Sequence, residues 1–178
     1  GESIGLIPDP QWKREVQQEP WVDGDTYLLS IGQGNVLTTP LQVTAGFAAL
    51  ANGGVLYEPH MVKHIIHSSD VLEEQDAEIT VIEPEIIGRD FIDQENLQVA
   101  KEGMRAAVKW GSAVLLNQLD VDVAAKTGTA QIARSEGGGY YEDKFLHSFF
   151  GYFPAYDAKY LVFLYTVEPK EVRYASQT

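Results

Sequence analysis

The fold can be inferred outward from one run of the chain, Val121-Asp122-Val123-Ala124-Ala125-Lys126-Thr127-Gly128-Thr129-Ala130-Gln131. Small and apolar residues lead into a lysine, two hydroxyls and a glycine within four positions. In an extended strand Lys126 and Gly128 lie on one face, and Thr127 and Thr129 on the other. The glycine allows another backbone to approach closely. The run therefore predicts a strand whose groups suit an anion beside an acyl group.

Three strands are predicted to close the chain: Val121–Ile132, Phe145–Phe153 and Tyr160–Val167. The stretch Ser135–Gly139 has the composition of a flexible turn, and Pro154–Ala158 is short enough for a hairpin connection. Short connections join antiparallel strands, whereas parallel strands need long crossovers. The sequence therefore predicts a three-stranded antiparallel meander.

Two helices are predicted upstream of this meander. The first begins after Thr39, because Thr39 and Gln42 form a capping box and Pro40 suits the first helical position. It ends at Asn52-Gly53-Gly54, residues that accept a left-handed cap. The second helix spans Gln94–Trp110, with apolar residues at helical spacing on one face.

Asp93 is the predicted cap of the second helix and Gly111 its stop, and a short helix is predicted over Ala113–Leu119. Residues 1–37 are interpreted as an irregular lead-in with short elements. One or two strands are predicted over residues 55–66. Residues 67–85 are interpreted as an acidic surface excursion with a strand at Ile79–Ile82.

The composition favours one globular domain over residues 1–178, with 44% hydrophobic residues. The net charge of −13 argues against a nucleic-acid partner, which requires a basic surface. The absence of cysteine excludes disulfides and thiol-bound metals and suits a location outside the cytoplasm. No apolar run reaches the length of a membrane span, and no signal-peptide pattern opens the chain.

Beyond the Lys126-Thr127-Gly128-Thr129 tetrapeptide, several motifs in fixed order resemble the transpeptidase domain of class B penicillin-binding proteins. They are Ile31-Gly32-Gln33-Gly34, Thr39-Pro40-Leu41-Gln42, Ala51-Asn52-Gly53-Gly54, Glu58-Pro59-His60-Met61-Val62, Glu102-Gly103-Met104, Gly111-Ser112-Ala113 and His147-Ser148-Phe149-Phe150-Gly151. The sequence around Gly32-Gln33-Gly34 is most similar to the cell-elongation subgroup, the penicillin-binding protein 2 type. A lone Lys-Thr-Gly would favour an ordinary strand with an exposed lysine, but the ordered motifs favour the family. One departure is Ala125, where glycine is usual in the family.

The resemblance implies an α+β fold of the penicillin-binding-protein and beta-lactamase type, an antiparallel sheet packed with helices. The family's nucleophile lies in a Ser-x-x-Lys turn, and no serine of this chain has a lysine three residues later. We therefore expect the chain to be a C-terminal portion of the domain, truncated at both ends and inactive alone, with the serine nucleophile upstream. The rest of its own domain is then an expected partner.

The resemblance also implies the activity, a serine-type D,D-transpeptidase. Such an enzyme cross-links the peptidoglycan of the cell wall, supports cell shape and is an antibiotic target. A serine attacks a stem peptide ending in D-Ala-D-Ala, and beta-lactams acylate the same serine. No cofactor and no metal are implied. Implied partners include cell-elongation proteins, and the implied location is the extracytoplasmic or periplasmic side of a bacterial cytoplasmic membrane protein.

Roles at four positions follow from the same resemblance. Lys126 is implied to be catalytic, because it tunes the proton chemistry of the serine and attracts the substrate carboxylate. The backbone N–H of Thr129 is implied to be an oxyanion-hole donor, a type of contact that contributes about 3–4 kcal/mol. The hydroxyls of Thr127 and Thr129 are implied to bind the carboxylate, and Gly128 to allow close approach of the nucleophile's helix.

Two other functions remain open on the sequence. One is a non-catalytic beta-lactam sensor or partner-binding module of the same fold. The other is a serine beta-lactamase, which Thr39-Pro40-Leu41-Gln42 and Gly32-Gln33-Gly34 disfavour. The number of membrane spans in the upstream sequence would separate a sensor from an elongation enzyme.

Several further residues have a simpler interpretation than a functional one. On a strand, His60 and His64 would share a face too far apart to chelate one ion, and His67 would face the other way. Ser68-Ser69-Asp70 is similar to the second motif of the family, but it does not occupy that motif's place in the order of motifs along the chain. It is interpreted as a loop. The acidic residues 70–85 lack a calcium-loop pattern. His147 is expected either near the cleft or in a core or edge position.

Overall fold

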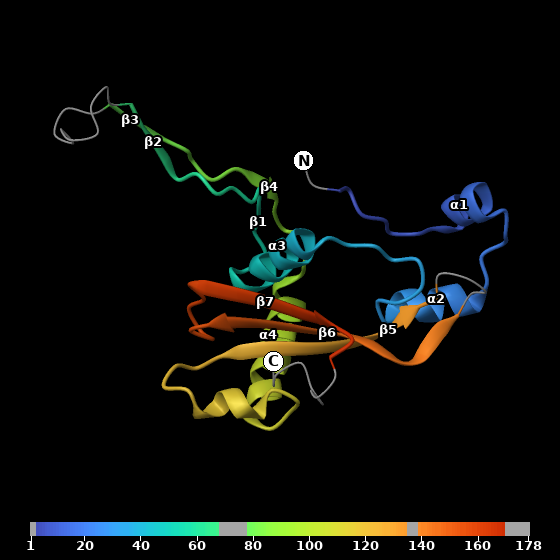
Figure 1. Cartoon of the computed structure of the whole chain (residues 1–178). Helices are drawn as coiled ribbons and strands as arrows, with labels where there is room; N and C mark the ends of the chain where they lie inside the picture. Colours follow the sequence, from blue (N-terminus) through green and yellow to red (C-terminus); the bar gives the residue numbers. More distant parts are fainter. Residues whose placement is uncertain (1–2, 68–77, 135–138, 170–178) are drawn as a thin grey trace.

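The computed structural model describes residues 3–67, 78–134 and 139–169. Its elements are α1 (Pro10–Trp12), a π-helical turn (Lys13–Gln17), α2 (Asp23–Ser30), α3 (Pro40–Ala51), β1 (Leu56–Tyr57), β2 (His64–His67), β3 (Glu78–Val81), β4 (Ile86–Gly88), α4 (Gln94–Lys109), a 3₁₀ turn (Val114–Gln118), β5 (Ala124–Ala133), β6 (Tyr140–Phe153) and β7 (Tyr160–Val167). Helices pack against an antiparallel sheet, as expected of an α+β fold (Figure 1).

The three C-terminal strands form the predicted antiparallel meander in the order β5-β6-β7. In its register Lys126 lies opposite Phe150, and Phe150 lies opposite Phe163. β6 begins at Tyr140, earlier than the predicted Phe145. Charged residues before Phe145 hide the apolar alternation there, but the backbone still pairs with β5 past an irregularity in the ladder. The predicted turn at Ser135–Gly139 lies largely outside the described residues.

Helices cover both faces of this sheet. Phe47 of α3 stacks on Phe150 at 4.0 Å between ring centroids, on the face that carries Lys126. Val108 of α4 packs in a buried cluster with Ala125 and Phe149, which lie on the opposite face. Other residues of α4 and β5 join a second cluster, made of Ala51, Met104, Ala124, Tyr152 and Ala155. α4 therefore connects both clusters beside the first residues of β5.

The two predicted helices begin as the capping residues indicated. The Thr39 hydroxyl accepts from the Gln42 N–H at 3.1 Å, and the Gln42 side chain accepts from the Thr39 N–H at 3.0 Å. The Asp93 carboxylate accepts from the Glu95 N–H at 2.8 Å at the start of α4. Such caps satisfy N–H groups that have no partner within the helix.

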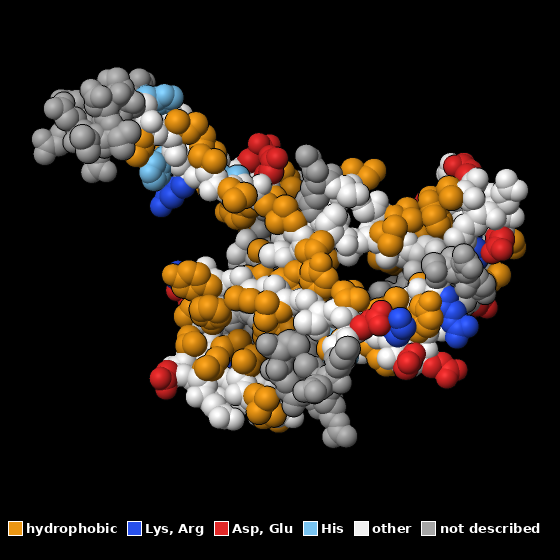
Figure 2. Space-filling model, viewed as in Figure 1, with side chains coloured by type: hydrophobic (Ala, Val, Ile, Leu, Met, Phe, Trp, Pro, Cys, Tyr) orange, Lys and Arg blue, Asp and Glu red, His pale blue; other side chains and the backbone are white. Residues whose placement is uncertain are grey.

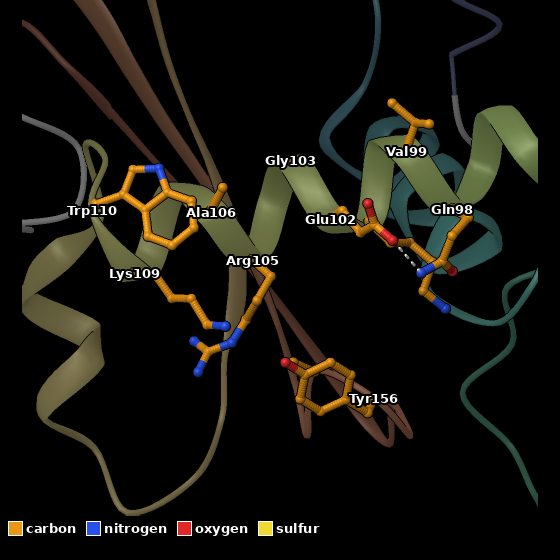
Figure 3. Close-up of a pocket in the computed structure, with 11 residues that line it drawn as sticks. Gln98, Val99, Glu102, Gly103, Arg105, Ala106, Lys109, Trp110 and Tyr156 are labelled. Carbon is orange, nitrogen blue, oxygen red and sulfur yellow. Dashed lines mark hydrogen bonds between the residues drawn. The ribbon is translucent and has the colours of Figure 1, made fainter.

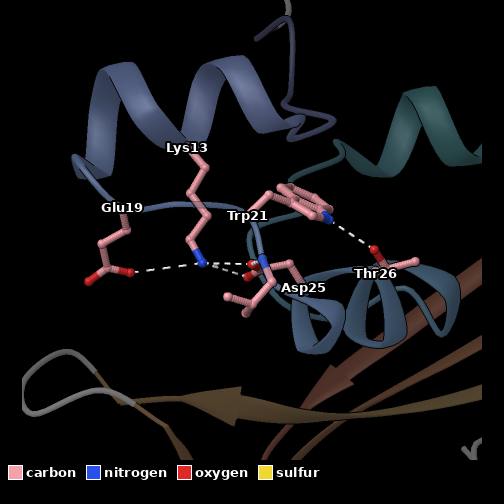
Figure 4. A network of polar contacts seen from close by, with 6 residues as sticks. Lys13, Glu19, Trp21, Asp25 and Thr26 are labelled. Carbon is pink, nitrogen blue, oxygen red and sulfur yellow. Dashed lines mark hydrogen bonds and ion pairs between the residues drawn. The ribbon is translucent and has the colours of Figure 1, made fainter.

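The N-terminal segment contains more helix than the expected irregular lead-in, because a buried ion pair supports it (Figure 4). The Lys13 side chain is 8% exposed, and its Nζ lies 2.7 Å from Oδ2 of Asp25 in α2. Asp25 also accepts from the N–H of Val22 at 2.8 Å, which caps α2. Lys13 and Asp25 lie twelve positions apart in the sequence, so the local periodicity of the chain does not predict that they form an ion pair.

We expect the Lys13–Asp25 pair to make stability fall in acid. The hydrogen bond from Lys13 lowers the pKa of Asp25 below its ordinary value of 3.8, so its contribution is present above that pH and is lost as pH falls through the folded-state pKa. Thermal unfolding measured between about pH 5 and about pH 2 should therefore show a steeper loss for the native protein than for Asp25→Asn. The matched control is Glu19→Gln, whose carboxylate is largely exposed and 3.8 Å from Lys13, and it should follow the native curve. Parallel curves for Asp25→Asn and the native protein would contradict this role.

A two-stranded hairpin of β2 and β3 projects from the body (Figure 1). The expected strand at Ile79–Ile82 is confirmed as β3, one residue earlier at each end. His60 lies outside any strand, so the expectation that it shares a strand face with His64 is wrong; its ring instead contacts the Val62 carbonyl oxygen at 3.0 Å. Pro59 lacks the N–H that a continuous strand would need there. Ser68-Ser69-Asp70 lies outside the described residues.

Hydrophobic side chains remain on the surface of the sheet and of the hairpin (Figure 2). The exposed members are Ile65, Ile66, Ile79 and Val81 on the hairpin and Val162, Leu164, Tyr165 and Val167 on β7. Apolar surface of this extent is suited to contact with another protein segment. Within the described ranges, the helices are too short or too polar to cross a membrane.

Candidate active site

The candidate site lies along β5, which pairs with β6 on one side only among the described strands. Lys126 and Gly128 lie on the α3 face, as their register partners Phe150 and Ser148 show. Lys126 is exposed, and its ammonium donates to the carbonyl oxygen of Thr127. The site is thus an accessible strand edge that carries a cation and lies beside buried residues of β6.

Two side-chain contacts reveal which backbone groups face this edge. Carbonyl oxygens of Val123 and Thr127 accept from the side chains of Arg105 and Lys126, whereas the Asp122 carbonyl accepts from the Ala155 N–H beyond β6. In an antiparallel strand, the N–H and C=O of one residue point to the same side, and the side alternates along the chain. We infer that Thr127 and Thr129 direct their backbone N–H groups away from β6, toward the accessible edge.

Gly128 is needed where it stands because its neighbour on β6 is close. A Cβ at Gly128 would lie 2.5 Å from the hydroxyl oxygen of Ser148. The sequence predicted a close approach at this glycine, and in the described residues the approaching group is this serine. A side chain here would require the Ser148 hydroxyl to move.

The hydroxyl of Thr127 has a specific partner on the other face. Its Oγ1 lies 2.7 Å from Oγ of Ser112, in the turn that follows α4. Ala113 of that turn is fully buried against Val108 and Ala125. The turn therefore joins the end of α4 to the strand that carries the lysine.

A row of polar side chains crosses the sheet on this same face. Thr129 lies opposite His147, and His147 lies opposite Thr166. His147 is 7% exposed, so of the two expected places it takes the core position, next to Thr129. Nδ1 of His147 and Oγ1 of Thr166 are buried and have no hydrogen-bond partner within residues 3–67, 78–134 and 139–169. Thr129 itself is exposed at the edge.

A separate pocket of about 690 Å³ lies between α4 and the turn after β6, and no residue of β5 lines it. Figure 3 shows Arg105 and Lys109 projecting from α4 into the space between Trp110 and Tyr156. Arg105 is held by an ion pair with Asp122 and by the Val123 carbonyl. The Lys-Thr-Gly-Thr run therefore lies outside this pocket.

The whole chain, residues 1–178, matches the model of one protein family, the penicillin binding protein transpeptidase domain. The chain belongs to this family. Its similarity to a peptidoglycan D,D-transpeptidase MrdA of Haemophilus influenzae is 34% identity over 134 residues, covering 74% of this chain and 20% of the relative. The chain thus spans about a fifth of the length of the curated relatives it matches.

Solved structures place the fold in the same group of penicillin-binding proteins. A complex of PBP2 with MreC from Helicobacter pylori has a TM-score of 0.68 at 27% identity, covering 94% of this chain and 28% of that one. PBP3 from Mycobacterium tuberculosis, complexed with ampicillin, has a TM-score of 0.73 at 28% identity, covering 95% of this chain and 35% of that one. The α+β transpeptidase fold and the resemblance to the penicillin-binding protein 2 type are both confirmed by these matches.

The Ser112–Thr127 contact is the feature of the site that the sequence did not predict. In the sequence, Gly111-Ser112-Ala113 is a motif shared with the family, and Gly111 is the predicted end of a helix. A serine flanked by two small residues after a long amphipathic helix was the available signal. The spacing of residues along the chain does not predict that the Ser112 hydroxyl contacts Thr127, fifteen residues later.

Proposed function

We propose that this transpeptidase domain chain is the portion of a peptidoglycan D,D-transpeptidase that binds the substrate carboxylate and stabilises the acyl-transfer transition state. The observation that carries the proposal is the edge of β5. It offers the Lys126 ammonium, outward N–H groups at Thr127 and Thr129, and two threonine hydroxyls within four residues. An edge of this kind is suited to a peptide whose C-terminal carboxylate follows the bond under attack.

The chemistry assigned to each group follows from its charge and hydrogen-bonding capacity. The Thr129 N–H donates to the oxyanion that forms when a serine attacks the carbonyl carbon between the two D-Ala residues. Lys126 attracts the carboxylate and favours loss of the serine's proton. Hydroxyls of Thr127 and Thr129 donate to the carboxylate, and Gly128 leaves room for the strand's neighbours. The D-Ala–D-Ala peptide bond then breaks, and the terminal D-Ala leaves with a proton on its amine. The serine carries the acyl group as an ester until a second stem peptide's amine attacks it, which breaks the ester bond and returns a proton to the serine.

Partners and location follow as further parts of the proposal. One structural neighbour is a complex with ampicillin, which supports binding of beta-lactams by this domain. Another is a complex with MreC, which supports contact with cell-elongation proteins. A peptidoglycan substrate implies a domain outside the cytoplasm, and the resemblance to the family implies a membrane-anchored protein. The remainder of a transpeptidase domain would pack on this chain and supply the serine.

We expect the 178-residue chain to form no covalent adduct with a fluorescent penicillin. None of its serines has a lysine three positions later, so no hydroxyl has the neighbour that would activate it. The same chain within a complete protein that includes a Ser-x-x-Lys turn should form a stoichiometric adduct. The measurement is gel fluorescence after denaturation, with unlabelled penicillin as competitor. An adduct on a serine of this chain, or none on the complete protein, would overturn the proposal.

A further inference from the structure

The turn after α4 places the hydroxyl of Ser112 beside Thr127 of the Lys-Thr-Gly-Thr strand. Oγ of Ser112 lies 2.7 Å from Oγ1 of Thr127, and either oxygen could be the donor. Ser112 is exposed and Thr127 is half-buried, so a bound ligand can reach this pair from the edge of β5. The distance is that of a good O–H···O hydrogen bond.

Both residues that flank Ser112 are fixed to α4 and its core. A Cβ at Gly111 would lie 2.7 Å from the backbone Cα of Ala107, so the chain can turn this tightly only with glycine there. Ala113 donates its N–H to the Ala107 carbonyl at 3.0 Å and is fully buried. Ser112 is therefore held from both sides, and the position of its hydroxyl is set by the end of the helix.

The direction of the hydrogen bond follows from the chemistry of a carboxylate. An ionised carboxylate only accepts hydrogen bonds, and a threonine hydroxyl has a single proton to donate. If Thr127 donates that proton to a carboxylate, its bond with Ser112 can persist only with Ser112 as the donor. We propose that Ser112 is a positioning residue that donates to Thr127 and so directs the Thr127 proton toward the substrate carboxylate. This inference rests on the proposed function, because it needs a carboxylate at this edge.

The proposal predicts a selective effect. Without the Ser112 hydroxyl, the Thr127 hydroxyl is free to rotate and to donate elsewhere, so part of its preference for the carboxylate is lost. A neutral hydrogen bond of this kind contributes about 1 to 1.4 kcal/mol, which corresponds to about a five- to tenfold change in rate or affinity. The rate or affinity for a ligand without a carboxylate should not change when the Ser112 hydroxyl is removed, because the Thr127 hydroxyl then has no carboxylate to which it could donate.

The test compares two ligands on the complete protein: a penicillin with its free carboxylate and the methyl ester of the same penicillin. Ser112→Ala should lower the second-order acylation rate constant for the acid about five- to tenfold and leave that for the ester unchanged. Ser112→Thr, which keeps a hydroxyl, should restore the native rate. Thr127→Val should slow the acid, and adding Ser112→Ala to it should cause no further loss. If Ser112→Ala does not fold, Ser112→Cys replaces it, because a thiol is a weak donor.

The outcomes separate this inference from the proposed function. Equal slowing of acid and ester by Ser112→Ala would mean that the turn only supports the strand, and it would overturn the inference, as would an unchanged rate for the acid. If the native protein reacted with acid and ester at the same rate, the edge of β5 would not recognise the carboxylate. That result would overturn the proposed carboxylate role and the inference with it.

Discussion

Replacing Lys126 by alanine in the complete protein should slow acylation by penicillin at least about 100-fold, the scale of a lost proton-transfer group. The stability of the fold should not change, because Lys126 is exposed and belongs to neither buried cluster of the sheet. Its contact within the described residues is with the carbonyl oxygen of the next residue, Thr127. The charge therefore serves the edge of β5 and not the packing beneath it.

The measurement is the acylation rate with a fluorescent penicillin, taken beside a thermal melt of each variant. Lys159→Ala is the matched control, because Lys159 is an exposed lysine of the same sheet region, paired with Asp157 in the turn after β6. It should acylate at the native rate. Near-native acylation by Lys126→Ala, with the control unchanged, would contradict the catalytic role assigned to Lys126.

The second large effect concerns stability: Phe150→Ala should lower the free energy of unfolding by about 3–5 kcal/mol. The ring of Phe150 is 7% exposed and lies between two others, 4.0 Å from Phe47 of α3 and 4.3 Å from Phe163 of β7. Truncation removes both stacking contacts and leaves a cavity between the helix and the sheet. Because Phe150 lies opposite Lys126, the same cavity would loosen the strand that carries the site.

Urea-induced unfolding of the native protein and of Phe150→Ala gives this free energy directly. Tyr160→Ala is the control, because Tyr160 is an aromatic residue of the same sheet that is 65% exposed. Its loss should cost less than about 1 kcal/mol. If Phe150→Ala also lowered the free energy of unfolding by less than about 1 kcal/mol, the packing of α3 would not depend on the aromatic stack.

The elements that the sequence predicted best are those whose signals lie within a few residues. The capping box at Thr39 and Gln42 and the cap at Asp93 set the starts of two helices, because each is a contact across one helical turn. The meander followed from alternating apolar residues and a short connection after β6. The family, and with it the Lys126-to-Thr129 site, followed from ordered motifs, although the assigned roles of these residues remain predictions.

What the sequence could not determine depended on contacts between distant positions. The helix at Asp23–Ser30 is supported by Lys13, and the early start of β6 by pairing with β5. In each case the contact joins segments that are distant in sequence, and tertiary context of this kind can override a weak local propensity.

The sequence by itself determined the fold family, the strand that carries Lys126 and the faces on which its side chains alternate, because a strand has a fixed period of two. Only the tertiary structure decided which groups meet. It placed His147 in the core beside Thr129, turned the N–H groups of Thr127 and Thr129 to the accessible edge, and joined Thr127 to Ser112. A hydrogen bond depends on distances in space of about 3 Å, and residue spacing along the chain does not specify them.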